Sequence, residues 1–526
     1  MAEAEAIDAQ DAEAATGGES APKKKHKLHF PTAITVLFIV MLFAAALTYI
    51  VPAGEYSKLL YDSSQDAFVI TKPDGSQENM PPTQETLDKL GVSGSLDSFL
   101  DGSITKPIAI PGTYQKVDQQ PQGALEFLLA PIKGVYDTID IILFIFILGG
   151  CIGVLNYMGA LNAAVAALSR VTKGKEYIRK EYILIIVLGL IMVAGGTTFG
   201  LAEETIALYP ILMPVFIAAG YDAMTCIAVI FVGSSVGTMY STVNPFATGV
   251  ATKAAGISMA DGMSWRFVAL AIGTIISFAY VLRYARKVRL DPSKSVCYDF
   301  KDKIEERWGA QGETPEFTGR MKISLAVFGL SFVVLVWGIV TAQWWFDSMT
   351  SVFLACAMIL AFVCGLPEET FMDQFISGAG DLMSTALVVG VARAVNILLE
   401  DGLISDTILH FFSGVVSGMS PILFILMMLV VYIVLGFFIN SSSGLAVLSI
   451  PIMAPLGDAV GVSKSAIIAA YNYGQGLISY ITPTGLILAS LAMVDVPFSR
   501  WLKFINPLLI ITILLNALLL IGQVVI

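Results

Sequence analysis

The sequence predicts an all-α integral membrane protein with two inverted-topology repeats, each holding a re-entrant hairpin and a broken transmembrane helix. Of the 526 residues, 56% are hydrophobic and 14% are charged, whereas soluble domains average about 25% charged residues. Polar backbone breakers interrupt the most apolar stretches and recur at a fixed spacing. A hydrophilic stretch at 54–122 adds a small extracytoplasmic insertion to this fold.

The breakers of residues 438–483 match an earlier part of the chain when the sequence is shifted by 241 positions. Pro451 and Pro455 then fall on Pro210 and Pro214. Three glycines also fall on glycines, and the offset shortens by a few residues beyond them (Gly436 on Gly195, Gly461 on Gly220, Gly474 on Gly233, and Thr482-Pro483 on Asn244-Pro245). Repeats of broken apolar segments are typical of secondary transporters, whose sites lie where the breaks meet.

The first half begins with a cytoplasmic tail at 1–30, acidic, Ala-rich and expected to be largely disordered. The first repeat follows at 31–282, and its first span, 31–51, is longer than the apolar core of about 7–15 residues in a cleaved signal peptide. After the insertion come an amphipathic segment, a span, a hairpin broken at 195–205, a span broken at Thr242 to Pro245, and a last span (124–136, 139–158, 182–219, 223–243 and 265–281). Two full spans remain an alternative to the hairpin.

The second half starts with a cytoplasmic linker at 283–322 and a linking span at 323–341. The second, inverted repeat occupies 349–526. Its elements repeat the first series, with a hairpin broken at Asn440 (349–364, 371–380, 382–399, 422–460, 466–488 and 501–526). Because the linking span adds one crossing, the two repeats have opposite orientations in the membrane.

The distribution of basic residues supports this topology. The predicted inner loops hold 21 of the 31 Lys and Arg residues, and the outer loops hold nine. This is the positive-inside bias of multi-pass proteins. We therefore expect a multi-pass protein of the cytoplasmic (inner) membrane.

Glu203 and Glu204 lie beside the first break and are followed by Thr205. Acidic residues in a first helical turn stabilise the helix dipole, so the pair could be a simple cap. Two adjacent carboxylates near the middle of a membrane are costly, however, and such groups usually mark a substrate or ion path. We expect them to contact a substrate or a coupling cation.

Asn440, Ser441, Ser442 and Ser443 occupy the matching break of the second repeat, which contains no acid. Free N–H groups at a helix start, together with hydroxyls, can hold an anion. The alternative is a helix cap whose hydroxyls pack against a neighbouring helix. Both interpretations remain open.

The broken spans carry Thr242 and Asn244 in the first repeat and Thr482 and Thr484 in the second, each beside a proline. Proline frees a carbonyl, and free carbonyls with Thr or Asn oxygens suit Na⁺ or a substrate ammonium. A plain proline kink is the alternative. Three further polar residues of the second broken span are secondary candidates for lining the site (Asn472, Tyr473 and Gln475).

Arg393 lies about two-thirds along a predicted span. It could pair with a structural acid such as Asp381 or Glu400, or extend towards the outer surface. It could instead bind a substrate carboxylate, which arginine holds with two parallel hydrogen bonds.

Four motifs resemble one known family: GGTTFGLAEETIALYPILMPVFIAAGYD, GTMYSTVNPFATGVA, INSSSGLAVLSIPIMAPLGD and YNYGQGLISYITPTG. They are similar to the anaerobic C4-dicarboxylate carrier C (DcuC) family, and more closely to its YfcC-like branch, whose members are described as basic amino acid antiporters. The resemblance covers about residues 31–526 and implies the ion-transporter superfamily fold. The residues disagree with the family name, because two glutamates would repel a dianion unless protonated or screened.

We expect a secondary transporter that is not an enzyme and that exchanges basic amino acids, with arginine and ornithine as the favoured pair. The alternatives are a Na⁺- or H⁺-coupled transporter of C4-dicarboxylates or other carboxylates, and an ion channel or receptor that uses the insertion as a sensor. No cofactor or bound metal is expected, although coupling to Na⁺ or H⁺ is open, with Na⁺ near Asn244 or Thr482. The expected partners are a small-molecule substrate and lipid, with a homodimer left open and no nucleic acid.

Overall fold

The computed structural model describes residues 32–526 except 101–103, 105, 161–162, 164–177, 309–316, 343 and 345. The tail predicted at 1–30 lies outside the described residues. Eight of the described helices are long and apolar enough to cross a membrane, which confirms a multi-pass helical protein (α1 Ala33–Ile50, α5 Ile139–Tyr157, α12 Met263–Leu290, α15 Phe346–Val363, α17 Met383–Asp401, α19 Pro421–Phe438, α20 Ser442–Ala459 and α23 Phe498–Val525).

Helices of the two halves pack against each other in a reciprocal pattern. Helix α4 (Ala124–Asp137) packs against α17, while α16 (Glu368–Asp381) packs against α5. In the same way, α1 contacts α17 and α15 contacts α5. Both interfaces are built on glycines, because a Cβ on Gly134 would lie 2.2 Å from the Gly390 carbonyl oxygen and one on Gly149 would lie 2.7 Å from that of Gly378. Small residues allow helices to approach this closely in lipid.

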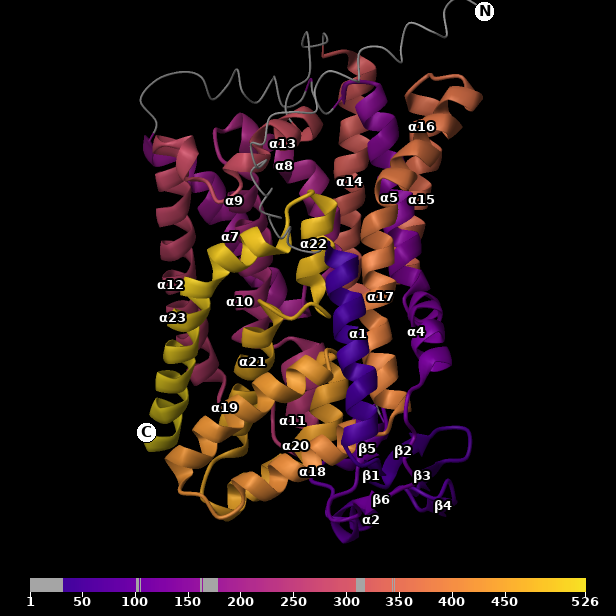
Figure 1. Cartoon of the computed structure of the whole chain (residues 1–526), viewed down its shortest axis with the longest axis vertical. Helices are drawn as coiled ribbons and strands as arrows, with labels where there is room; N and C mark the ends of the chain where they lie inside the picture. The colour runs from indigo at the N-terminus through magenta and orange to yellow at the C-terminus, as the bar shows by residue number, and fades with distance from the viewer. Residues whose placement is uncertain are drawn as a thin grey trace, which may run out of the picture. The chain divides into compact units, whose positions relative to one another are not determined.

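The broken elements of the two halves lie towards opposite ends of the bundle. In Figure 1, α8 (Tyr209–Ala218) and α9 (Ala223–Ile227) lie near the end that holds α13 (Lys301–Trp308), whereas α19 and α20 lie near the strands. Within the first half α7 (Ile178–Phe199) packs on α10 (Gly233–Met239), and within the second α19 packs on α21 (Lys464–Ser479). Short pieces continue the broken spans (η1 Glu203–Leu208, η2 Ala228–Val232, η3 Pro245–Gly249, α11 Val250–Ala254 and α22 Leu486–Met493).

The insertion is a small sheet domain, so the all-α prediction applies to the membrane part only. Strands β4, β3, β2 and β5 form one antiparallel sheet, and β1 pairs with β6 (β1 Gly54–Glu55, β2 Lys58–Asp62, β3 Ala67–Thr71, β4 Gln77–Met80, β5 Ile108–Ala109, β6 Gln115–Lys116). Leu59 and Ile70 face each other across β2 and β3 and are buried. Gly75, at φ +79°, allows the turn between β3 and β4. Two short helices complete the domain (α2 Gln84–Lys89 and α3 Leu96–Leu100).

Several boundaries differ from those predicted. Helix α7 continues through Gly195 to Phe199, so the first break is shorter than predicted. Helix α12 continues past Val281 to Leu290 before the linker begins. An amphipathic helix, α18 (Ser405–Val416), lies between α17 and α19 where no element was predicted. The linker and linking span form the remaining elements (η4 Pro292–Lys294, η5 Tyr298–Phe300, α13 and α14 Gly319–Ala342).

The glycine interface between α5 and α16 predicts a specific loss of stability. A Cβ on Gly153 would lie 2.5 Å from the Gln374 carbonyl oxygen, whereas one on Gly380 in α16 meets no atom within 4 Å. Overpacking of this kind costs about 1–3 kcal/mol. We expect Gly153→Ala to lower the Tm of the detergent-solubilised protein and Gly380→Ala to leave it within error. Equal Tm values for the two variants would contradict this packing.

Candidate functional site

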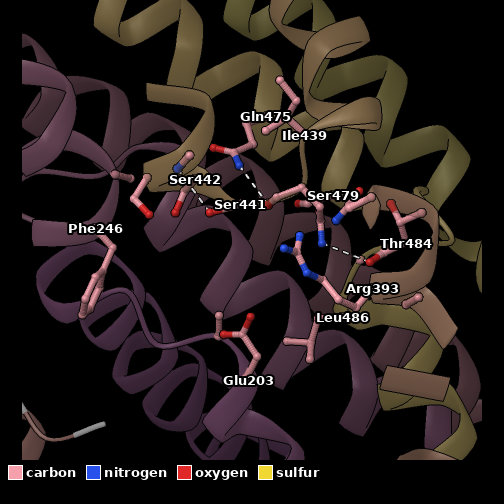
Figure 2. A pocket seen from close by; sticks show the side chains of 18 of the residues that line it. Glu203, Phe246, Arg393, Ile439, Ser441, Ser442, Gln475, Ser479, Thr484 and Leu486 are labelled. Atoms are coloured by element: carbon pink, nitrogen blue, oxygen red, sulfur yellow. Dashed lines mark hydrogen bonds between the residues drawn. The ribbon is translucent and has the colours of Figure 1, made fainter. Parts of the chain in front are cut away.

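A polar cavity of about 860 Å³ lies where the breaks of both halves meet. Its walls come from α4, α5, η1, η2, α10 and η3 in the first half, and from α17, α18, α20, α21 and α22 in the second. Figure 2 shows Glu203 and the Ser441–Ser442 pair on different sides of this pocket. The insertion also contributes Glu55, Lys58 and Lys106.

The first break follows α7 and turns the chain at Gly200, which adopts φ +74°. A Cβ at Gly200 would lie 2.8 Å from Asn244 Nδ2, so the close approach also requires glycine. The Ser234 hydroxyl donates to the Leu201 carbonyl, and Glu204 Oε2 accepts a hydrogen bond of 3.0 Å from the Ala202 amide. These bonds satisfy backbone groups that the break would otherwise leave unpaired.

The glutamates of this break differ in their contacts. Glu204 caps the start of η1 through the Ala202 amide, as a structural role requires. The Glu203 side chain is exposed to the cavity. Neither carboxylate forms an ion pair with a basic side chain within the described part of the chain. Glu203 is thus available to a ligand, and Glu204 lines the same cavity while it also holds the loop.

The second break is tied to the α21–α22 break by side chains. Asn440 Nδ2 donates to the Thr484 carbonyl at 3.0 Å, and Gln475 Nε2 donates to the Asn440 carbonyl at 3.3 Å. Figure 2 labels Gln475 and Thr484, where dashed lines mark hydrogen bonds. Ser441 caps α20, since its Oγ accepts from the Gly444 amide at 3.2 Å. The Ser442 carbonyl accepts from the Tyr471 hydroxyl at 2.7 Å.

The break of the first half at Asn244 is built in a related way. Asn244 Oδ1 accepts from the amides of Phe246 and Ala247 at 2.9 and 3.3 Å and so caps η3. Thr242 is held by Thr197, whose Oγ1 accepts from the Thr242 amide at 2.9 Å. The guanidinium of Arg266, which the sequence reasoning missed, donates to the Thr242 carbonyl at 3.0 Å.

Most of the sequence-predicted residues line this one cavity (Glu203, Glu204, Asn244, Arg393, Asn440, Ser441, Ser442, Ser443, Asn472, Gln475 and Thr484). Four predicted residues do not line it: Tyr473, Thr205, Thr242 and Thr482 are almost fully buried. Thr205 Oγ1 donates to the Ala202 carbonyl at 2.6 Å, and the Thr482 hydroxyl bonds that of Thr484 at 2.8 Å. The threonine hydroxyls are therefore used to hold the breaks together.

Arg393 pairs with acids on two helices. Its guanidinium contacts Asp137 at the end of α4, and its Nη1 lies 3.3 Å from Glu400 Oε1. Glu400 was one of the two partners considered from sequence. Asp137 was not considered, because nothing in the sequence shows that α4 and α17 pack together. Arg393 also lines the cavity, so the ion pairs do not remove it from reach of a ligand.

The charged groups of the cavity are mostly acidic. Seven acidic and three basic side chains line it, a formal excess of four negative charges (Glu55, Asp137, Asp140, Glu203, Glu204, Glu400 and Asp406 against Lys58, Lys106 and Arg393). The described part of the chain contains no cluster of three or more His, Cys, Asp or Glu side chains able to hold a metal ion.

Comparison with known sequences gives the chain its family. The family model described as "C4-dicarboxylate anaerobic carrier" (DcuC) matches residues 30–525. An uncharacterized protein of Haemophilus influenzae is 43% identical over 507 residues, covering 96% of this chain and 99% of that protein. A protein of Escherichia coli, named "Putative basic amino acid antiporter YfcC", is 28% identical over 528 residues and covers 96% of this chain and 98% of its own length.

Two solved structures are also similar. The YdaH transporter of Alcanivorax borkumensis has a TM-score of 0.35 at 14% identity, covering 93% of this chain and 97% of its own. MtrF of Neisseria gonorrhoeae, whose structure is described as illuminating a class of antimetabolite efflux pumps, has a TM-score of 0.36 at 15% identity, covering 95% and 96%. Both TM-scores lie below 0.5, so nothing about this chain is inferred from these two structures.

A multi-pass helical protein with a polar cavity between broken helices is typical of secondary transporters. Together with the family match, this makes the protein a membrane transporter and not an enzyme. The chain belongs to the C4-dicarboxylate anaerobic carrier (DcuC) family.

The side chain of Asn440 predicts a measurable contribution to stability. Removing it leaves the Thr484 carbonyl without the 3.0 Å bond that now satisfies it, at a cost of about 1–3 kcal/mol. We expect Asn440→Ala to lower the Tm in detergent. Ser479→Ala is the matched control, because Ser479 lines the same cavity but bonds only within its own helix, to the Gly476 carbonyl. A Tm for Asn440→Ala no lower than that of the control would show that the two breaks are not coupled.

Proposed function

We propose that the protein transports a basic amino acid across the cytoplasmic membrane by alternating access, exchanging arginine against ornithine or a similar pair. The observation that carries the proposal is the excess of four negative charges on the cavity wall. A cavity of one predominant sign concentrates ligands of the opposite sign. A dianionic substrate would have to overcome this field, whereas a guanidinium or ammonium group is attracted by it.

The two breaks supply different ends of such a substrate. We assign the cationic end to Glu203, Glu204 and the Asn244 region. The α-carboxylate lies at the tip from Asn440 to Ser443, where these residues line the cavity at the start of α20 without an acid among them. The separation of Glu203 from Ser441 across the pocket supports this orientation (Figure 2).

In many secondary transporters that work by alternating access, the two halves are related by inversion in the membrane. We propose that they are inverted repeats, that α7–α8 and α19–α20 are re-entrant hairpins, and that residues 31–282 and 349–526 are the repeat boundaries. Three observations support this arrangement. They are the offset of 241 positions, the reciprocal packing of α4 on α17 and α16 on α5, and the placement of α8 and α20 towards opposite ends in Figure 1.

A Na⁺- or H⁺-coupled carboxylate transporter is the second candidate, because the family description names C4-dicarboxylates. In that case Glu203 and Glu204 would serve the coupling ion, and Na⁺ would bind near Asn244 or Thr482. Thr482 Oγ1 already bonds Thr484, and Asn244 Oδ1 already accepts two amide bonds. These contacts favour a structural use of both groups over ion binding.

The glutamates provide the test of the substrate assignment. We expect Glu203→Gln, and to a similar degree Glu204→Gln, to reduce uptake of labelled arginine into proteoliposomes more than a hundredfold. The reason is that the guanidinium of the bound substrate would lose its carboxylate partner, and breaking one side of a buried charge pair costs about 3–5 kcal/mol. Glu368→Gln is the control, because Glu368 and Glu369 form a similar pair in the first turn of α16, away from the cavity. Normal uptake by both cavity variants would leave the glutamates as helix caps and remove the basis for a basic substrate.

The inverted repeats are tested by two cysteines at equivalent positions. Ala218 and Ala459 are 241 residues apart, end α8 and α20 respectively, and are both exposed. We expect Ala218→Cys to react with a membrane-impermeant maleimide from the cytoplasmic side only, and Ala459→Cys from the outside only. Lys303→Cys in the linker and Lys89→Cys in the insertion give the inside and outside references. Labelling of both test cysteines from one side would rule out the inversion.

A further inference from the structure

The insertion reaches the transport cavity through one basic side chain. Lys106 lies just before β5, and its Nζ donates to Ser443 Oγ at 3.0 Å and to Ser441 Oγ at 3.3 Å. These serines belong to the break between α19 and α20, more than 330 residues further along the chain. A part of the protein outside the membrane therefore places a positive charge on the tip of the second hairpin.

This placement is fixed by the way the insertion docks. Strand β5 pairs with β2, where Leu59 faces Ile108, and it packs against α20. Val447 of α20 is buried in the same apolar cluster as Leu59 and Ile108. The position of Lys106 thus depends on a packed domain core that includes a helix of the second half.

A second contact holds the insertion to α18. The Tyr56 amide donates to Asp406 Oδ2 at 3.0 Å, and the Tyr114 hydroxyl lies 2.8 Å from Thr407 Oγ1. The Tyr114 ring stacks on His410 with 4.0 Å between the ring centroids. Because α18 leads directly into α19, the insertion is attached both to the segment before the hairpin that Lys106 contacts and to α20 within it.

The ammonium group has hydroxyl partners but no carboxylate partner. Among the described residues, no acidic side chain lies within 4.0 Å of Lys106 Nζ, which donates hydrogen bonds to the two serines. Burial, together with the nearby Arg393 guanidinium, holds the pKa of Lys106 below its usual range. A lysine in these surroundings gains by binding an anion, whose oxygens would accept charge-assisted hydrogen bonds from its ammonium group.

We propose that Lys106 and the hydroxyls of Ser441 and Ser443 form the carboxylate subsite of the transporter, so that the insertion is part of the substrate-binding site. This inference rests on the proposed function, since it supplies the group that binds the substrate carboxylate at the end of the cavity opposite Glu203. Without a ligand, the Lys106 ammonium donates hydrogen bonds to the hydroxyls of Ser441 and Ser443. With a ligand, the carboxylate lies between the ammonium and the hydroxyls.

The test compares how well L-arginine and L-argininamide compete for uptake of labelled arginine by reconstituted protein. In the wild type we expect the free acid to compete at least about tenfold better than the amide, because the amide cannot form the charge-assisted hydrogen bond of the carboxylate. Lys106→Met should weaken competition by the acid about tenfold or more and bring the acid and the amide close together. Lys106→Arg should retain most of the difference. Lys116→Met, an exposed lysine of β6 in the same domain, is the matched control.

The outcomes separate this inference from the proposed function. If the wild type takes up arginine and Lys106→Met keeps the full preference for the acid, Lys106 is a structural contact and the subsite is wrong. If Lys106→Met lowers the maximal rate of arginine uptake but keeps the preference for the acid over the amide, Lys106 is likewise a structural contact. If the wild type ignores arginine and takes up succinate, the basic substrate is wrong, and the subsite is judged by whether Lys106→Met weakens succinate uptake at least about tenfold.

Discussion

The structure depends on satisfying backbone groups where helices break at membrane depth. An unpaired amide or carbonyl there has no water to bond, so each break must be closed by protein groups. The Asn440 side chain donates to the Thr484 carbonyl, and the Ser234 hydroxyl donates to the Leu201 carbonyl. The Thr197 hydroxyl accepts from the Thr242 amide. These bonds join segments from different helices, so the breaks come together at one place. The cavity is a consequence of this joining, because small polar side chains cannot fill the space that the helices leave.

The helices could be predicted from sequence because apolar length and breakers are local signals. The breaks at Asn244 and Asn440 are found where Pro and small polar residues interrupt apolar runs. Local signals do not show which side chains face a cavity. Thr242 and Thr482 were predicted to line the site but are buried at the helix breaks. Lys106 and Asp137 could not be found, because their roles come from contacts between segments hundreds of residues apart.

Charge gives the cavity two different ends in the proposed account. The first half contributes carboxylates at Glu203 and Glu204, and the second contributes hydroxyls and amides at the tip of α20. Lys106 adds a positive charge to the hydroxyl end, and Arg393 is balanced by Asp137 and Glu400. A ligand with a carboxylate and a cationic group fits this polarity, whereas a dicarboxylate would place one anion beside the glutamates. The family description and the site therefore favour different substrates.

The most direct test of the account is counterflow in proteoliposomes loaded with single unlabelled solutes and supplied with labelled arginine outside. The account predicts that internal arginine or ornithine drives transient accumulation of the label without a Na⁺ gradient, and that internal succinate does not. Accumulation of labelled succinate that depends on a Na⁺ or H⁺ gradient, with no arginine exchange, would contradict a basic substrate and support the coupled carboxylate transporter.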